Sequence, residues 1–226
     1  MTERMTQPSA RRYLAWPADY HEYVFKDGKF VGDFDNMYRH AKGIPWEQDT
    51  RCEQWYTEVG MVMIKAHAPY ASILEVGCGL GYIAAKLRAF VRSDALDAFD
   101  VSPTAIEKAQ RLHQAIRFYA DDITKTAFKP RQRYELVVVK DLFWYVLAAL
   151  PTVLRNLEAC VAPGGWLYVC QSFPRLDEPF VGRDLIPNPE ALLARLHSYI
   201  PGHLLVLHNR DFPDAGPMLH VLGVKS

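Results

Sequence analysis

One short stretch of the sequence, residues 73–82, limits the folds that this chain can adopt. An apolar run ends at Glu75, and three glycines follow at alternate positions, at Gly77, Gly79 and Gly81. Glycine has no Cβ, so such a loop can turn tightly and let a ligand approach the main chain. A helical pattern begins at once, and the start of a helix presents backbone N–H groups to a ligand. The stretch therefore predicts a strand, a ligand-binding loop and a helix.

Strand and helix patterns alternate along the rest of the chain. Helices between the first five strands imply a parallel sheet with right-handed crossovers. The last two strands have no helix between them, which indicates antiparallel pairing. The predicted fold is α/β, with a doubly wound, mostly parallel seven-stranded sheet, helices on both faces and an antiparallel last strand. The expected strands are residues 72–76, 95–99, 116–119, 135–139, 166–171, 203–208 and 218–224.

Residues 1–48 are the least regular part of the sequence and are rich in aromatic side chains. A Lys-Asp-Gly-Lys turn at residues 26–29 indicates two short extended segments. We expect this aromatic-rich extension to serve as a lid of the same domain, whose main part is residues 49–226. Aromatic faces in such a lid suit apolar rings and cations.

A helical spacing of apolar residues begins near residue 50. Thr50 and Glu53 match the capping-box pattern that starts many helices. The apolar residues that follow, Trp55 and Val62 among them, fall on one face at helical spacing. We therefore expect one amphipathic helix that packs this face on the sheet.

The composition is that of a folded protein with no net charge. The 226 residues suffice for one α/β domain, and 50% of them are hydrophobic. Lys+Arg and Asp+Glu both number 26, so no global field draws the chain to nucleic acid or to an anionic membrane. No apolar run reaches the roughly 18 residues of a membrane helix, and residues 1–12 lack the apolar core of a signal peptide. Four scattered cysteines indicate free thiols, so a cytoplasmic location is expected.

Acidic residues follow the second, third and fourth expected strands. Ligands of an open α/β sheet bind beyond the carboxyl ends of its strands. Asp100 follows the second strand, where a carboxylate can accept hydrogen bonds from a ribose diol. Asp97 lies inside that strand and is expected to point away from the rim of the sheet. Asp121 and Asp122 follow the third strand, and Asp141 follows the fourth.

The glycine loop, the acid before it and the segment after Asp100 together resemble the class I S-adenosylmethionine (SAM)-dependent methyltransferases. The G-x-G-x-G spacing differs from the G-x-G-x-x-G of dinucleotide-binding folds, which disfavours a nicotinamide dehydrogenase. The Pro-Gly-Gly turn at residues 163–165 also matches the family's usual turn before the fifth strand. The resemblance implies SAM as the cofactor and S-adenosylhomocysteine (SAH) as its product.

The resemblance also implies a role for each landmark. The glycine loop would wrap the methionine part of SAM, with Glu75 facing its amino group. Asp100 would bind the ribose. Asp122, with Asp121 as the alternative, would accept the adenine amino proton, and Ile123 would pack on the ring. The expected cofactor-binding residues are Glu75, Gly77, Cys78, Gly79, Gly81, Tyr82, Asp100, Val101, Ser102, Asp122, Ile123 and Lys140.

The acceptor side of the site is less defined by the sequence. An oxygen acceptor of high pKa needs a base, whereas a neutral amine does not. The candidate catalytic residues are Asp141, Tyr145, His21 and His40. Lys140 departs from the small residue that is usual in the family at its position. No cluster of acids and asparagine indicates a metal site, and no N-P-P-Y loop follows the fourth strand, which disfavours nucleic-acid substrates.

The expected function is methyl transfer from SAM to an O or N atom of a small metabolite, as in bacterial biosynthetic pathways. A monomer or a homodimer is expected. The alternative is a catalytically silent SAM-binding subunit that regulates or scaffolds a partner, because the motifs describe cofactor binding and not turnover.

Overall fold

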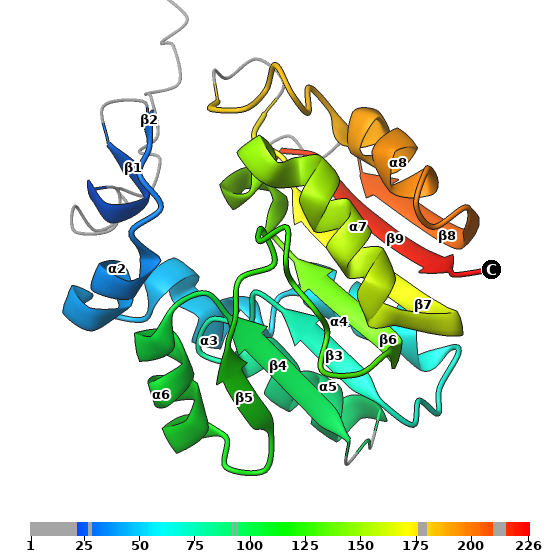
Figure 1. Cartoon of the computed structure of the whole chain (residues 1–226), viewed down its shortest axis with the longest axis horizontal. Coiled ribbons are helices and arrows are strands. Elements are labelled where there is room, and N and C mark those ends of the chain that lie inside the picture. Colours follow the sequence, from blue (N-terminus) through cyan, green and yellow to red (C-terminus); the bar gives the residue numbers. More distant parts are fainter. Residues whose placement is uncertain (1–21, 27–28, 92, 94, 176–179, 210–215) are drawn as a thin grey trace, which may run out of the picture.

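A seven-stranded sheet forms the centre of the protein (Figure 1). The computed structural model describes residues 22–26, 29–91, 93, 95–175, 180–209 and 216–226. The strands of the sheet are β3 (Ile73–Val76), β4 (Leu96–Asp100), β5 (Arg117–Ala120), β6 (Tyr134–Lys140), β7 (Val161–Ser172), β8 (Gly202–Asn209) and β9 (Met218–Val224).

The strand order is β5-β4-β3-β6-β7-β9-β8. Neighbouring strands from β5 to β7 run parallel, whereas β9 runs antiparallel to both β7 and β8. The predicted sheet with its antiparallel last strand is thereby confirmed. The chain moves from β3 to one edge and then returns to place β6 on the other side of β3. The strand order reverses there, and open α/β sheets bind ligands in the crevice at such a point.

Helices cover both faces of the sheet, and alternate residues of each strand serve the two cores. Within β6, Val137 and Val139 belong to one core and Leu136 and Val138 to the other, as the two-residue period of a strand requires. Each such buried side chain contributes roughly 1.5–3 kcal/mol. One face carries α4 (Trp55–Lys65), α5 (Tyr82–Val91) and α6 (Pro103–Leu112), and the other carries α7 (Leu150–Cys160) and α8 (Pro189–His197) (Figure 1).

Single residues set the starts of two helices. The Ser102 hydroxyl accepts a hydrogen bond from the backbone N–H of Ala105 at 3.0 Å and so caps α6. Pro151 lies in the first turn of α7, where its missing N–H costs nothing. Within the described part of the chain, no helix has the length and apolar character needed to cross a lipid bilayer.

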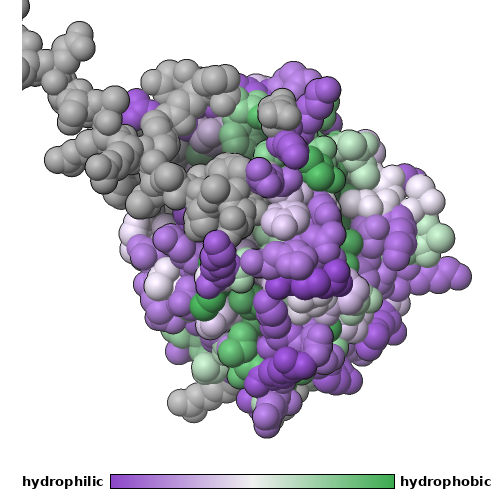
Figure 2. All heavy atoms as spheres, turned by 90° about the vertical axis from the view of Figure 1, so that its left-hand side faces the viewer, coloured by the Kyte–Doolittle hydropathy of each residue, from purple (hydrophilic) through white to green (hydrophobic). Residues whose placement is uncertain are grey.

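The N-terminal segment, whose described residues are 22–26 and 29–51, lies beyond the rim of the sheet where β4 and β5 end (Figure 1). Figure 2 views the molecule from this side, where hydrophilic residues predominate on the described surface and apolar residues form smaller patches. The two short strands of the segment pair antiparallel, with Lys26 opposite Lys29, and the tip of the predicted turn, residues 27–28, lies outside the described residues. Met37 and Tyr38 pack with Leu80 and Ala105 in a small core of their own. The elements of this segment are β1 (Phe25–Lys26), β2 (Lys29–Phe30), α2 (Phe34–His40), the 3-10 turn η1 (Pro45–Glu47) and α3 (Gln48–Arg51).

The single helix predicted from residue 50 is wrong, because the chain breaks there into α3 and α4. The Thr50 hydroxyl donates to the Glu47 carbonyl at 3.1 Å and does not cap α4. The buried face of α4 also differs from the predicted one, since Trp55 is 48% and Val62 63% exposed. Gly60 is instead buried against the Tyr168 hydroxyl, where a Cβ would clash. A hydrophobicity pattern counts large apolar residues and so misses a face that packs through glycine.

Candidate active site

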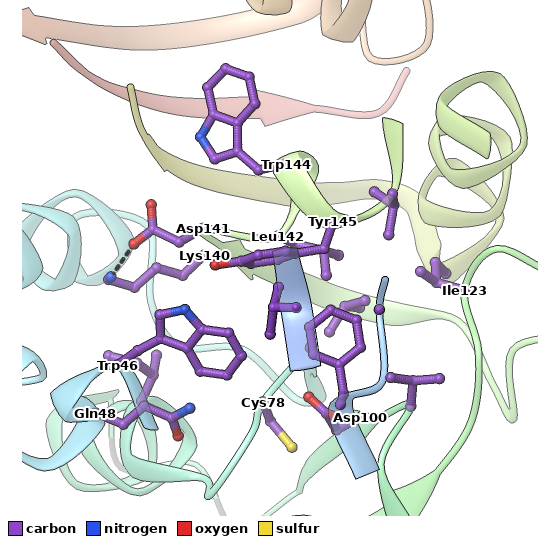
Figure 3. A pocket seen from close by; sticks show the side chains of 18 of the residues that line it. Trp46, Gln48, Cys78, Asp100, Ile123, Lys140, Asp141, Leu142, Trp144 and Tyr145 are labelled. Carbon is purple, nitrogen blue, oxygen red and sulfur yellow. Dashed lines mark hydrogen bonds and ion pairs between the residues drawn. The ribbon is translucent and has the colours of Figure 1, made fainter. Parts of the chain in front are cut away.

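A cavity of about 550 Å³ opens at the rim of the sheet where the strands end (Figure 3). Its lining combines the glycine loop, the residues after β4, β5, β6 and β7, and the aromatic side chains of the N-terminal segment. The volume lies within the roughly 300–1,000 Å³ of small-molecule sites. The cavity therefore occupies the place that the strand order indicates for a ligand.

The glycine loop follows β3 and bends back over β4. Gly77 has φ +74°, in the left-handed region that favours glycine, and the N–H groups of Gly77 and Cys78 donate to the Phe99 carbonyl at 2.9 and 3.0 Å. Both residues line the cavity, as does Tyr82, as predicted. Gly79 and Gly81 are absent from the lining.

Packing accounts for these two glycines. A Cβ at Gly79 would lie 2.5 Å from the Gln48 amide, and a Cβ at Gly81 would lie 2.5 Å from the Phe118 ring. Their φ angles, +52° and +82°, also favour glycine. Their contact with the ligand stays a prediction, and the structure places neighbouring side chains against both glycines.

Asp100 ends β4 and holds the glycine loop in place. One carboxylate oxygen accepts from the N–H of Gly79 at 2.9 Å and the other from the N–H of Ser102 at 2.9 Å. Burial raises the pKa of this carboxyl group. Asp100 and Val101 line the cavity as predicted, and each carboxylate oxygen has a second lone pair for a ligand.

Ser102 does not line the cavity, in contrast to the prediction. Its hydroxyl caps α6 and donates to the Asp35 carboxylate at 2.9 Å. Ser102 thus joins α6 to the N-terminal segment. Asp97, on the same strand as Asp100, lies away from the cavity and accepts from the Tyr134 hydroxyl at 2.7 Å.

Glu75 is a buried acid that faces the cavity. Its side chain is 3% exposed, and burial raises its pKa to about 8 against the opposing hydrogen bond from the Ala84 backbone. Oxygen Oε2 has no hydrogen-bond partner among the described residues. A buried acceptor without a hydrogen-bond donor lowers the stability of the fold. A ligand with a cationic N–H group would supply that donor, so Glu75 is suited to bind one.

The turn after β5 brings both predicted acids and Ile123 to the cavity. The Asp122 carboxylate accepts from the N–H and the hydroxyl of Thr124 at 2.9 and 2.6 Å. The Asp121 carboxylate accepts from the N–H of Asp122 at 2.8 Å. Ile123 is buried and presents an apolar surface on the side of the cavity opposite Lys140 (Figure 3).

Lys140 and Asp141 form an ion pair at the end of β6, with 2.6 Å between Nζ and Oδ2 (Figure 3). The other oxygen of Asp141 accepts from the N–H and the hydroxyl of Ser172 at 2.7 and 2.5 Å. Burial opposes both charges, but their attraction outweighs it. The pKa of Asp141 is therefore lowered and that of Lys140 is raised. Both residues line the cavity.

Aromatic rings from three separate segments line the side of the cavity that faces the N-terminal segment. We call Phe25, Phe34, Trp46, Tyr145 and Phe180 the aromatic wall. The ring centroid of Tyr145 lies 5.4 Å from that of Phe34, 5.6 Å from that of Trp46 and 6.1 Å from that of Phe25. Burial raises the pKa of Tyr145.

Two wall and rim residues adopt left-handed backbone conformations although neither is glycine. Trp46 has φ 56° and Asp141 has φ 52°. Such conformations cost on the order of 1–3 kcal/mol each and gather at functional sites. Here they turn the Trp46 indole and the Asp141 carboxylate toward the cavity.

His40, one of the two predicted histidines, is not brought to the cavity. His40 is exposed at the end of α2, where its ring stacks on Tyr23 at 6.3 Å between centroids. It is absent from the lining, because α2 turns this side chain outward. His21 lies outside the described residues.

Sequence reasoning missed three polar residues of the N-terminal segment that line the cavity, Tyr38, Gln48 and Arg51. The Gln48 amide donates to the Tyr38 hydroxyl at 2.8 Å and accepts from the N–H of Leu80 at 2.8 Å. No local pattern marks these contacts, which join residues 10 and 32 positions apart. The only available signal in the sequence was that Gln48 and Arg51, two polar residues, come just before the helical pattern.

The class I SAM-dependent methyltransferase fold has a crossover sheet of this kind. A G-x-G-x-G loop follows its first parallel strand, and an acid follows its second. The chain has this fold. A protein-family model described as a methyltransferase domain matches residues 73–165. This range contains the glycine loop and the acids after β4, β5 and β6.

Two curated relatives match part of the chain. Nodulation protein S of Rhizobium tropici is 29% identical over 129 residues, which are 54% of this chain and 52% of the relative. A malonyl-(acyl-carrier protein) O-methyltransferase of Anoxybacillus flavithermus is 34% identical over 89 residues, which are 38% of this chain and 34% of the relative. The matched regions thus span about half the length of the first relative and a third of the second.

Solved structures share the fold over most of this chain. The N-methyltransferase NodS of Bradyrhizobium japonicum, in complex with SAH, aligns with a TM-score of 0.65 and 19% identity over 84% of this chain and 97% of that one. TehB of Haemophilus influenzae aligns with a TM-score of 0.57 and 14% identity over 79% of this chain and 67% of that one.

Proposed function

We propose that this protein is a SAM-dependent methyltransferase that acts on an O or N atom of a small metabolite. The observation that carries the proposal is the pairing of Glu75 and Asp100 in one cavity, at the ends of adjacent strands. The first is a buried acid whose Oε2 has no partner among the described residues. The second is a buried acid that anchors the glycine loop. A ligand with an ammonium group for Glu75 and a ribose for Asp100 would pair with both acids.

The residues of the cavity fit SAM. Glu75 would accept from the ammonium group of the methionine part, and Arg51 at the end of α3 would bind its carboxylate. A Cβ at Gly77 would lie 3.0 Å from the Leu142 side chain, so a larger residue there would crowd the space between the loop and Leu142. Asp100 would hold the ribose, and Ile123 with Asp122 would hold the adenine.

SAM supplies an activated methyl group on a sulfonium, and the protein aligns it with the acceptor. The acids at the ends of β3, β4 and β5 would each hold one part of the cofactor, and the aromatic wall would line the acceptor side. The names of the relatives include both an N- and an O-methyltransferase. These names support methyl transfer and leave the acceptor atom open between the two elements.

A silent SAM-binding subunit needs no space beside its cofactor. The aromatic wall and the Lys140–Asp141 pair lie in the same cavity as Glu75 and Asp100. This extra lined space supports a catalyst over a silent subunit.

A structure of the protein with SAH tests the proposal. We expect the amino group of SAH within 3.2 Å of Glu75, its ribose on Asp100 and its adenine against Ile123. SAH bound at another place, or absent from crystals grown at millimolar SAH, would refute the assignment. An aromatic wall sealed against the sulfur of bound SAH would favour the silent subunit.

A further inference from the structure

Aromatic rings form a large part of the cavity lining on the proposed acceptor side. The aromatic wall is continuous, since Phe25 joins Tyr145 at 6.1 Å and Phe180 at 6.1 Å between ring centroids. The rings of Phe34 and Trp46 also belong to this wall, with 6.2 Å between their centroids. Ring faces carry negative partial charge and attract cations as well as apolar groups.

The charges beside the aromatic wall are balanced. Among the described residues, the acids Glu75, Asp100 and Asp122 of the lining are already assigned to the cofactor by the proposed function. Lys140 is paired with Asp141 at 2.6 Å, so this pair adds little net charge. Recognition of a cation therefore falls to the ring faces of the aromatic wall.

A hydroxyl acceptor needs a base, and the described lining residues next to the aromatic wall are poor bases. Asp141 accepts hydrogen bonds from Lys140 and Ser172, which lower its pKa. Tyr145 is held neutral because burial raises its pKa. Glu75 lies under the glycine loop, where Ala84 of α5 is its neighbour, and its proposed role is to hold the cofactor.

We propose that the methyl acceptor is an amine on an apolar body, which the aromatic wall recognises in its ammonium form. This inference rests on the proposed methyltransferase function. The ammonium loses a proton to water, and the nitrogen lone pair of the resulting amine forms the new N–C bond. The C–S bond of SAM breaks and its electron pair stays on sulfur, which becomes a neutral thioether. The methylated ammonium can then lose a proton to water.

Two probes of equal shape and different charge test this recognition. Phenyltrimethylammonium and tert-butylbenzene differ in one central atom and one unit of charge. Their affinities are measured by tryptophan fluorescence in the presence of saturating SAH, whose own affinity is measured first. We expect the cation to bind about tenfold more tightly than the neutral probe, as for a partly desolvated cation–π site.

Substitutions assign the preference to the aromatic wall. Trp46→Leu and Tyr145→Leu should each reduce the preference for the cation over the neutral probe to less than about threefold. The affinity for SAH should change by less than about threefold in both variants. Tyr145→Phe keeps the ring and should keep the preference. Phe180→Leu provides a second wall variant if a Tyr145 variant does not fold. Trp55→Leu is the control, because Trp55 is exposed on α4 outside the cavity.

The outcomes separate this inference from the function on which it rests. If the protein binds SAH but binds the two probes with equal affinity, the proposal of an amine acceptor is overturned and the methyltransferase function still stands. A cation preference that survives both leucine variants would also overturn it, because the wall would not be its source. Failure to bind SAH would refute the proposed function itself.

Discussion

The Gln48 side chain accepts a hydrogen bond from the backbone N–H of Leu80 at 2.8 Å. It thereby ties the N-terminal segment to the glycine loop. The same amide donates to the Tyr38 hydroxyl at 2.8 Å. This side chain therefore holds the loop and the segment that covers it in one arrangement.

Removal of this link should weaken cofactor binding. We expect Gln48→Ala to lower the affinity for SAH about three- to tenfold, since the buried N–H of Leu80 loses its acceptor and the loop loses its preorganisation. Calorimetry checks the change. Gln54→Ala is the matched control, because Gln54 lies at the start of α4 outside the cavity. Equal affinities of the two variants would show that the loop keeps its shape without Gln48.

Asp100 should matter more for cofactor binding than Asp97, although both are buried acids on β4. We expect Asp100→Ala to lower SAH affinity tenfold or more, because it removes the anchor of Gly79 and the proposed ribose contact. Asp97→Asn should lower the melting temperature with little effect on affinity, because Asp97 binds Arg117 and Tyr134. A larger loss of affinity from Asp97→Asn would contradict the placement of the site.

Glu75 should make the stability of the ligand-free protein depend on pH. Burial raises its pKa from 4.5 to about 8, so between these values the folded state holds a proton that the unfolded state has released. The free energy of unfolding should therefore fall as the pH rises from about 4.5 to about 8. Glu75→Gln should flatten this slope, and SAH should flatten it in the wild type by pairing with the ionised acid. Melting curves from pH 5 to pH 8.5 measure both effects. The same slope in wild type and Glu75→Gln would refute the prediction.

The Lys140–Asp141 pair should stabilise the fold only as a pair. Lys140→Met should lower the free energy of unfolding by roughly 3 kcal/mol, because it leaves Asp141 without its cation in a largely buried place. Lys140→Met combined with Asp141→Asn should recover much of that loss, since no unpaired charge remains. Urea denaturation of the single and double variants measures the coupling. Additive effects would show that the two side chains act independently.

The cofactor side of the site could be predicted from the sequence because its signals are local. Glu75 lies near the end of a recognisable strand, and Asp100 and Asp122 come at or just after the ends of two others, so parallel topology predicts all three at one rim. Ser102, by contrast, follows the same strand as Asp100 but turns into α6 as its cap. Position after a strand does not say which way a side chain points.

The acceptor side could not be predicted in the same way because its contacts are long-range. Trp46 meets Tyr145 across nearly one hundred residues, and no spacing rule encodes that meeting. The dense aromatics of residues 1–48 indicated a lid but not which rings line it. His40, a candidate on chemical grounds, proved to face outward because helical phase directs it there.

Titration of the protein with SAM in a calorimeter tests the central claim most directly. The account predicts one site per chain with a dissociation constant in the low micromolar range or below, and binding reduced tenfold or more in Asp100→Ala. Absence of binding at several hundred micromolar SAM by the folded wild-type protein would contradict the account.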